Sequence, residues 1–229
     1  MERGYIALVL NAHLPFVRQP EYPRFLEERW LYEAISETYL PLLRVLRNLE
    51  AEKVPVRLTL VLSPTLTAML SDEVLRDRYV AWLDRQIELS EREKERTAGD
   101  PQFARLASLH ADLYTSARDD FTILYGGNVL TGFDYFYKKG RLEIMTSAAT
   151  HAFLPLYRDV PEAVAAQVET AVISHRRHFG KVASGFWLPQ LGWYPRMEEV
   201  LKAYSVRYTL VATRGALLGK PVPKYGSYS

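Results

Sequence analysis

Two patterns of hydrophobic and polar residues follow one another along this chain, and their order predicts five strand–helix units. The first pattern is a short apolar run, typical of a buried parallel strand, and it covers residues 5–13, 56–63, 141–151, 183–189 and 206–213. In the second pattern, between these runs, apolar residues recur every three or four positions, as they do on one face of a helix. Because strands that alternate with helices form parallel βαβ units, we predict an α/β fold, built either as an open sheet or as a barrel.

The helical patterns differ in length and continuity. A helix is expected from Trp30, and Pro41 should kink or split it, because proline lacks an N–H and its ring clashes with the preceding turn. The other helical patterns cover residues 72–97, 102–139 with a break at Gly126-Gly127, a segment that starts at 159–161, and 195–205.

Two segments are predicted as loops, and no linker is evident. Residues 13–25 contain three prolines, and residues 217–229 are rich in Pro, Gly, Ser and Tyr. The chain shows no internal repeat and no low-complexity segment. We therefore expect one domain.

Composition and charge exclude several classes of function. Apolar residues make up 48% and charged residues 24% of the chain, as in an ordinary globular protein. The net charge of +2 gives no electrostatic footprint for nucleic acid or an anionic membrane, and no apolar run is long enough to span a bilayer or to act as a signal peptide. The absence of cysteine excludes disulfides and thiolate metal sites and fits a cytoplasmic protein.

Candidate chemistry gathers where the predicted strands end. In parallel α/β folds the carboxyl ends of the strands share one edge, so polar and aromatic residues there should converge. Imidazole, amide and guanidinium groups bind sugar hydroxyls, and aromatic faces stack on sugar rings, so this edge suits a neutral, hydroxyl-rich ligand. The residues are Asn11 and His13; Ser63 and Pro64; Thr150, His151 and Phe153; Trp187, Pro189, Gln190, Trp193 and Tyr194; Thr213 and Arg214.

Each candidate also has a structural interpretation. His13 and His151 could be buried histidines whose nitrogens bond to backbone, Trp187 could belong to the core, and Arg214 could pair with a carboxylate. We expect no metal and no cofactor, because no third histidine or carboxylate is evident at the strand ends. The remaining histidines lie in helical patterns and are expected to be structural or exposed; they are His110, His175 and His178.

Four stretches together resemble glycoside hydrolase family 57, and are most similar to its 1,4-α-glucan branching enzyme group. They are LNAHLPFVRQPE, WLYEAISETYLPLL, LEIMTSAATHAFLPL and GFWLPQLGWYP. The resemblance implies a (β/α)7-type barrel, incomplete here with about five β/α units, that acts on α-glucans of the amylose or glycogen type. We expect residues 1–229 to be a partial catalytic barrel without the family's C-terminal helical domain.

The resemblance also implies roles for single residues. The family uses a retaining mechanism, in which a glutamate attacks the anomeric carbon and an aspartate acts as acid and then base. Gln190 occupies the position of that glutamate, and no residue of this chain is assigned as the acid/base. Substrate binding is expected from His13 and His151 in the donor subsite, and from Trp30, Trp187, Trp193 and Arg214.

Gln190 leaves several functions open. An amide cannot form a normal glycosyl ester, so catalysis should be impaired whether the glutamine is engineered or natural, unless another residue replaces it. The protein is then an impaired branching enzyme or glucanotransferase, or a non-catalytic α-glucan-binding pseudoenzyme. A metal-dependent polysaccharide deacetylase is a third hypothesis. The sequence does not specify an oligomeric state.

Overall fold

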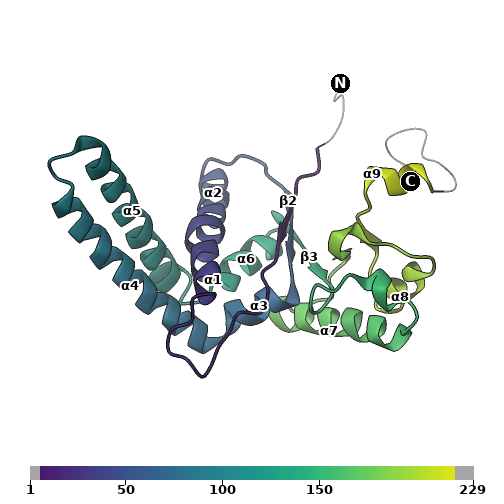
Figure 1. Ribbon diagram of the computed structural model, residues 1–229. Helices are drawn as coiled ribbons and strands as arrows, with labels where there is room; N and C mark the ends of the chain where they lie inside the picture. The colour runs from purple at the N-terminus through teal and green to yellow at the C-terminus, as the bar shows by residue number, and fades with distance from the viewer. Residues whose placement is uncertain (1–5, 220–229) are drawn as a thin grey trace. The chain divides into compact units, whose positions relative to one another are not determined.

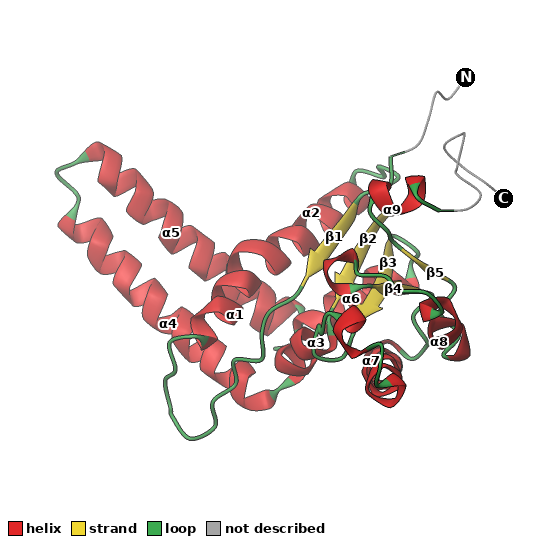
Figure 2. Ribbon diagram, turned by 45° about the vertical axis from the view of Figure 1, so that its right-hand side comes forward, coloured by secondary structure: helices red, strands yellow, loops and turns green. Residues whose placement is uncertain are grey.

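The computed structural model describes residues 6–219, and five strands form its sheet in sequential order, β1-β2-β3-β4-β5 (Figure 2). Strands β1 and β2, β3 and β4, and β4 and β5 pair in parallel. A doubly wound sheet reverses its strand order, whereas the wall of a β/α barrel runs in sequence, so the order favours a barrel wall. The predicted α/β class is confirmed, with strands Val9–Ala12 (β1), Leu58–Leu62 (β2), Leu142–Ser147 (β3), Gly185–Trp187 (β4) and Tyr208–Thr209 (β5).

The chain divides into two compact units. The first, here called the sheet unit, comprises Met1–Pro15, Leu58–Leu66 and Glu143–Ser229, and the second, the helical unit, comprises Phe16–Arg57 and Thr67–Leu142. The chain passes between the units four times, so no single linker separates them. The segments of the two units are therefore interleaved along the sequence, and no linker is recognisable between them.

The core of the sheet unit lies between β4 and two helices. Phe186 and Leu188 are fully buried with Val164 and Val168 of α7 and Leu201 of α8. The spacing of the two valines by four positions is the helical pattern expected after residue 159. The helices of this unit are α7 (Pro161–Phe179), α8 (Met197–Ala203) and α9 (Thr213–Leu217), with 3-10 turns at Leu154–Tyr157 and Pro189–Leu191.

The helical unit is dominated by two long antiparallel helices, α4 and α5, which lie side by side (Figure 1). Asp72 caps α4 by accepting a hydrogen bond from the backbone N–H of Leu75 at 3.0 Å, and Asp100 caps α5 in the same way. The helices are α1 (Glu28–Ala34), α2 (Leu40–Ala51), α4 (Glu73–Arg96), α5 (Pro101–Asp119) and α6 (Val129–Lys138); α3 (Pro64–Ser71) begins in the sheet unit, and the chain enters the helical unit within it.

Pro41 splits its helix as predicted. A π-helical turn, Ile35–Tyr39, separates α1 from α2, and the backbone N–H of Leu40 bonds to the carbonyl of Ile35. Pro41 then lies in the first turn of α2, where its missing N–H would have no partner inside the helix.

Several predicted boundaries are wrong at the strand ends. The fifth strand was expected over 206–213, but β5 has two residues because β4, its partner, has only three. Thr213–Leu217 forms α9 instead of strand and loop, while the tail from 220 onward lies outside the described residues. Ser63-Pro64 ends β2 as expected, yet Pro64 also starts α3, because proline suits the first helical position.

Candidate functional site

The two strand-end histidines meet in the sheet unit. His13 follows β1, His151 follows β3, and their imidazole rings stack with centroids 3.8 Å apart and planes 11° apart. The convergence that parallel strand ends predicted is therefore confirmed for this pair. Neither ring is satisfied by backbone alone, since both bond to side-chain hydroxyl groups.

Hydroxyl groups of β2 and α3 orient His13. Its Nδ1 lies 2.9 Å from Oγ of Ser63 and 3.3 Å from Oγ1 of Thr65. Thr65 donates its own proton to the carbonyl oxygen of Leu14 at 3.1 Å. Ser63 was predicted only as a residue at a strand end, and Thr65 was not predicted as a site residue. The signal that could have identified both is a hydroxyl residue on each side of Pro64, directly after a strand.

Ser147, at the end of β3, determines the tautomer of His151. Its Oγ donates to the carbonyl oxygen of Trp187 at 2.9 Å and lies 3.1 Å from Nδ1 of His151. Because the hydroxyl has one proton and gives it to the carbonyl, Nδ1 of His151 must be the donor to Ser147. Nε2 of His151 is then the acceptor nitrogen. Ser147 is fully buried and was not among the predicted site residues.

Both imidazoles are neutral near pH 7. Burial lowers the pKa of His13, and burial together with the neighbouring charge of His13 lowers the pKa of His151 to about 4. A neutral imidazole offers one donor and one acceptor, which matches sugar hydroxyls better than an anion.

Gln190 lies just past β4 with its side chain exposed and its backbone in the left-handed region, at φ 56°. Leu191 shares this conformation at φ 53°, and the turn is closed by a 2.8 Å hydrogen bond from the N–H of Leu191 to the carbonyl of Leu188. His151 also has φ 56°. Such conformations are costly for residues other than glycine and cluster at functional sites. Within residues 6–219, the Gln190 amide has no side-chain partner, so it is available to a ligand.

The other predicted site residues are more dispersed. Trp187 is half-buried in β4 and joins the histidine pair through its carbonyl and Ser147. Trp193 is 42% exposed and lines a separate hollow with residues of α8 and β5. Arg214 is exposed on α9, and no carboxylate within the described part of the chain pairs with it. Trp30 lies half-exposed on α1 in the helical unit.

His175 has the structural role that was expected of it. It is 3% exposed, and its ring nitrogens lie 2.8 Å from the carbonyl of Lys181 and 3.1 Å from that of Ile144. The ring therefore joins α7 to β3. Among residues 6–219, no three His, Asp or Glu side chains form a cluster that could hold a metal ion, and no helix is long and apolar enough to cross a membrane.

Sequential parallel strands with neutral imidazoles and an exposed amide at their carboxyl ends define an α/β protein of the barrel type, with a site suited to a neutral ligand. Comparison with known proteins names the family. The sequence pattern of glycosyl hydrolase family 57 matches residues 7–228, so the chain belongs to this family. The resemblance seen in the sequence is thereby confirmed.

Two solved structures that are similar to this chain agree with this assignment. The alpha-amylase AmyC of Thermotoga maritima is 39% identical with a TM-score of 0.94, over 100% of this chain and 43% of its own. The branching enzyme of Pyrococcus horikoshii is 28% identical with a TM-score of 0.85, over 95% of this chain and 43% of its own.

A third similar protein is a 1,4-alpha-glucan branching enzyme of Thermococcus kodakarensis, which is 29% identical over 93% of this chain and 33% of its own length. The chain thus spans between a third and a half of the length of each of these three proteins. Their names divide between alpha-amylase and branching enzyme.

Proposed function

We propose that the protein binds an α-glucan at the strand ends of the sheet unit, and that Gln190 occupies the place of the family's nucleophile. The observation that carries this proposal is the stacked, neutral pair His13 and His151, which Ser147 links to the carbonyl of Trp187, three positions before the exposed Gln190. Donor and acceptor nitrogens on two parallel rings suit the alternating hydroxyls of a glucose unit.

The proposed function includes impaired catalysis, because Gln190 replaces the nucleophile. A retaining glycosidase needs two carboxyl groups about 5–5.5 Å apart, one of which attacks the anomeric carbon. The amide of Gln190 is a poor nucleophile, and losing one member of a catalytic unit removes most of the rate enhancement. The site then holds glucan without cleaving it by this route.

For a site with glutamate at position 190, we propose glucan transfer as the reaction. In this reaction the 6-hydroxyl of a second glucan segment replaces water as the acceptor. The branching enzymes among the similar proteins support transfer, whereas the similarity to AmyC supports hydrolysis. The alternative to an impaired enzyme is a pseudoenzyme that only binds glucan.

Binding can be tested by titration calorimetry with maltoheptaose. We expect measurable binding by the unchanged protein and at least about tenfold weaker binding by His13→Ala, which removes one face of the stack. His110→Ala, an exposed histidine on α5, serves as the control and should bind as before. No heat for maltoheptaose would overturn the proposal. Trp193→Ala tests separately whether the hollow at Trp193 contributes.

Activity can be tested with Gln190→Glu in the complete natural protein, incubated with amylose. New α-1,6 linkages, detected by NMR, would support transfer, while new reducing ends alone would support hydrolysis. Gln102→Glu, at an exposed position of α5, is the matched control and should leave amylose unchanged. A folded Gln190→Glu protein without either product would leave the binding-only alternative.

A further inference from the structure

One pocket of the helical unit has a lining rich in arginine. This pocket, of about 470 Å³, lies between α1, α4 and the loop before α1, and all of its lining residues belong to this unit. Four arginines line it, and the only carboxylate among the lining residues is Glu28; the arginines are Arg24, Arg29, Arg78 and Arg85. The lining therefore carries a net charge of +3, from four arginines and one glutamate.

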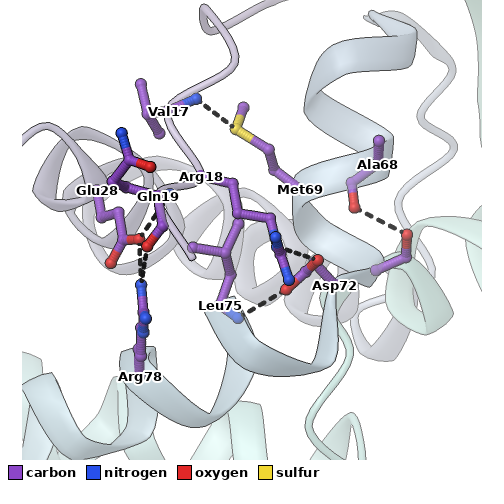
Figure 3. Close-up of polar contacts among 10 residues, drawn as sticks. Val17, Arg18, Gln19, Glu28, Ala68, Met69, Asp72, Leu75 and Arg78 are labelled. Carbon is purple, nitrogen blue, oxygen red and sulfur yellow. Dashed lines mark hydrogen bonds and ion pairs between the residues drawn. The ribbon is translucent and has the colours of Figure 1, made fainter. Parts of the chain in front are cut away.

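The single carboxylate is already neutralised. The side chain of Glu28 is 2% exposed, and its Oε1 accepts a 2.5 Å ion-pair hydrogen bond from Arg78 (Figure 3). Its Oε2 accepts from the hydroxyl of Tyr32 at 2.9 Å, and Arg78 also donates to the carbonyl oxygen of Gln19 at 2.9 Å. This buried network holds the wall of the pocket rigid. Glu28 cannot also compensate the remaining arginines.

The other positive charges lack equivalent partners. Arg29 has an exposed ion pair with Glu33 at 3.1 Å, which contributes little. Arg24 and Arg85 form no ion pair with any residue in 6–219. This distinguishes Arg85 from several other charged residues of its own helix, which are paired; examples are Asp84 with Arg118, and Arg92 with Glu88.

Arg85 is near the buried network, not directed away from it. Arg78, Trp82, Arg85 and Leu89 are spaced by four, three and four positions, so they lie along one face of α4. Burial is the main cause that raises the pKa of Tyr32, followed by its hydrogen bond to Glu28; the charges of Arg78 and Arg85 act in the opposite direction. The charge of Arg85 is therefore close enough to act on the Tyr32 hydroxyl.

The pocket combines this charge with an apolar wall. Leu26 and Leu89 line it with exposed fractions of 68% and 52%, beside the buried ring of Trp82. Pockets of a few hundred Å³ with apolar walls and few convergent polar groups are typical of small-ligand sites. Guanidinium groups bind phosphate oxygens in a bidentate manner, and a group with two or more negative charges balances an excess of +3 better than a single carboxylate does.

We propose that this pocket binds a small organic phosphate, with its phosphate groups on Arg85 and Arg24 and its organic part against Leu26 and Leu89. No part of the proposed glucan function requires such a site.

The test is titration calorimetry of the whole chain with ADP, glucose 1-phosphate, inorganic pyrophosphate and, as a carboxylate of similar charge, citrate. We expect ADP or glucose 1-phosphate to bind more tightly than inorganic pyrophosphate, and expect Arg85→Gln and Arg24→Gln each to weaken that binding about tenfold or more. Arg92→Gln, on the same helix but outside the pocket, is the matched control and should bind as the unchanged protein does. Circular dichroism verifies that each variant is folded.

Three results would overturn the proposal. They are no heat from either organic phosphate, binding of an organic phosphate that Arg85→Gln and Arg24→Gln leave unchanged, and citrate or pyrophosphate binding as tight as that of the organic phosphates. Maltoheptaose affinity should be the same in Arg85→Gln as in the unchanged protein, which separates this site from the glucan site.

Discussion

At the scale of single residues, the site is defined by hydroxyl groups that orient two imidazoles. Ser147 accepts from His151 and donates to the carbonyl of Trp187, so one buried oxygen couples the ends of β3 and β4. The sequence was sufficient to predict that His13 and His151 lie close together, because residues at the carboxyl ends of parallel strands share an edge. It could not identify Ser147, whose position inside an apolar run is common for a core residue.

Ser147→Ala should release His151. We expect a mixture of imidazole tautomers, because Nδ1–H loses its acceptor, and a loss of about 1 kcal/mol in the free energy of unfolding. Nitrogen NMR of the imidazole reports the tautomer, and urea unfolding reports the stability. Ser147→Thr keeps the hydroxyl and should restore the Nδ1–H form. An unchanged tautomer in Ser147→Ala would show that the serine does not set it.

At the scale of elements, local signals predicted the existence of helices and strands better than their ends. Pro41 and the caps Asp72 and Asp100 act within one helical turn, so their effects can be predicted from neighbouring residues. The length of β5 depends on how many residues β4 offers as partners, and that is set by packing between segments distant in sequence. The sheet therefore ended earlier than its apolar runs indicated.

Three strands pack closely around Gly185, the first residue of β4. A Cβ atom there would lie 2.5 Å from Cζ of Tyr208 in β5 and 2.7 Å from Cγ of Met145 in β3. Gly185→Ala should therefore lower the free energy of unfolding by about 1–3 kcal/mol, as overpacking does. Gly99→Ala is the control, since no atom lies within 4 Å of its new methyl group. Scanning calorimetry of both variants checks the difference, and equal Tm values would contradict it.

At the scale of the whole molecule, histidine burial links stability to pH. Burial is the main cause that lowers the pKa of four histidines, namely His13, His151, His175 and His178. In the unfolded chain the pKa of a histidine is about 6.5. Between that value and the lower folded values, the unfolded chain binds more protons than the folded protein, so stability must fall as pH falls.

We expect the Tm to decrease from pH 7 to pH 5, and the decrease to be smaller in His151→Asn. Asparagine is neutral over this range and tolerates the positive φ of position 151. His110→Asn is the control and should keep the full decrease. Calorimetric scans at several pH values between 7 and 5 measure the slopes, and identical slopes in His151→Asn and the unchanged protein would refute a role for His151.

Short-range information in the sequence determined the succession of strands and helices, the strand-end position of the two histidines and the family motifs, because periodicity, caps and turns act over a few residues. The tertiary structure alone decided which groups meet. His13 bonds to Ser63 and Glu28 to Arg78, in both cases fifty positions apart, and four of the arginines share one pocket. Such pairs depend on how helices and strands pack, which no local pattern specifies. Gln190 belongs to both groups, since the sequence identified the amide and the fold gave it a left-handed backbone and an exposed side chain.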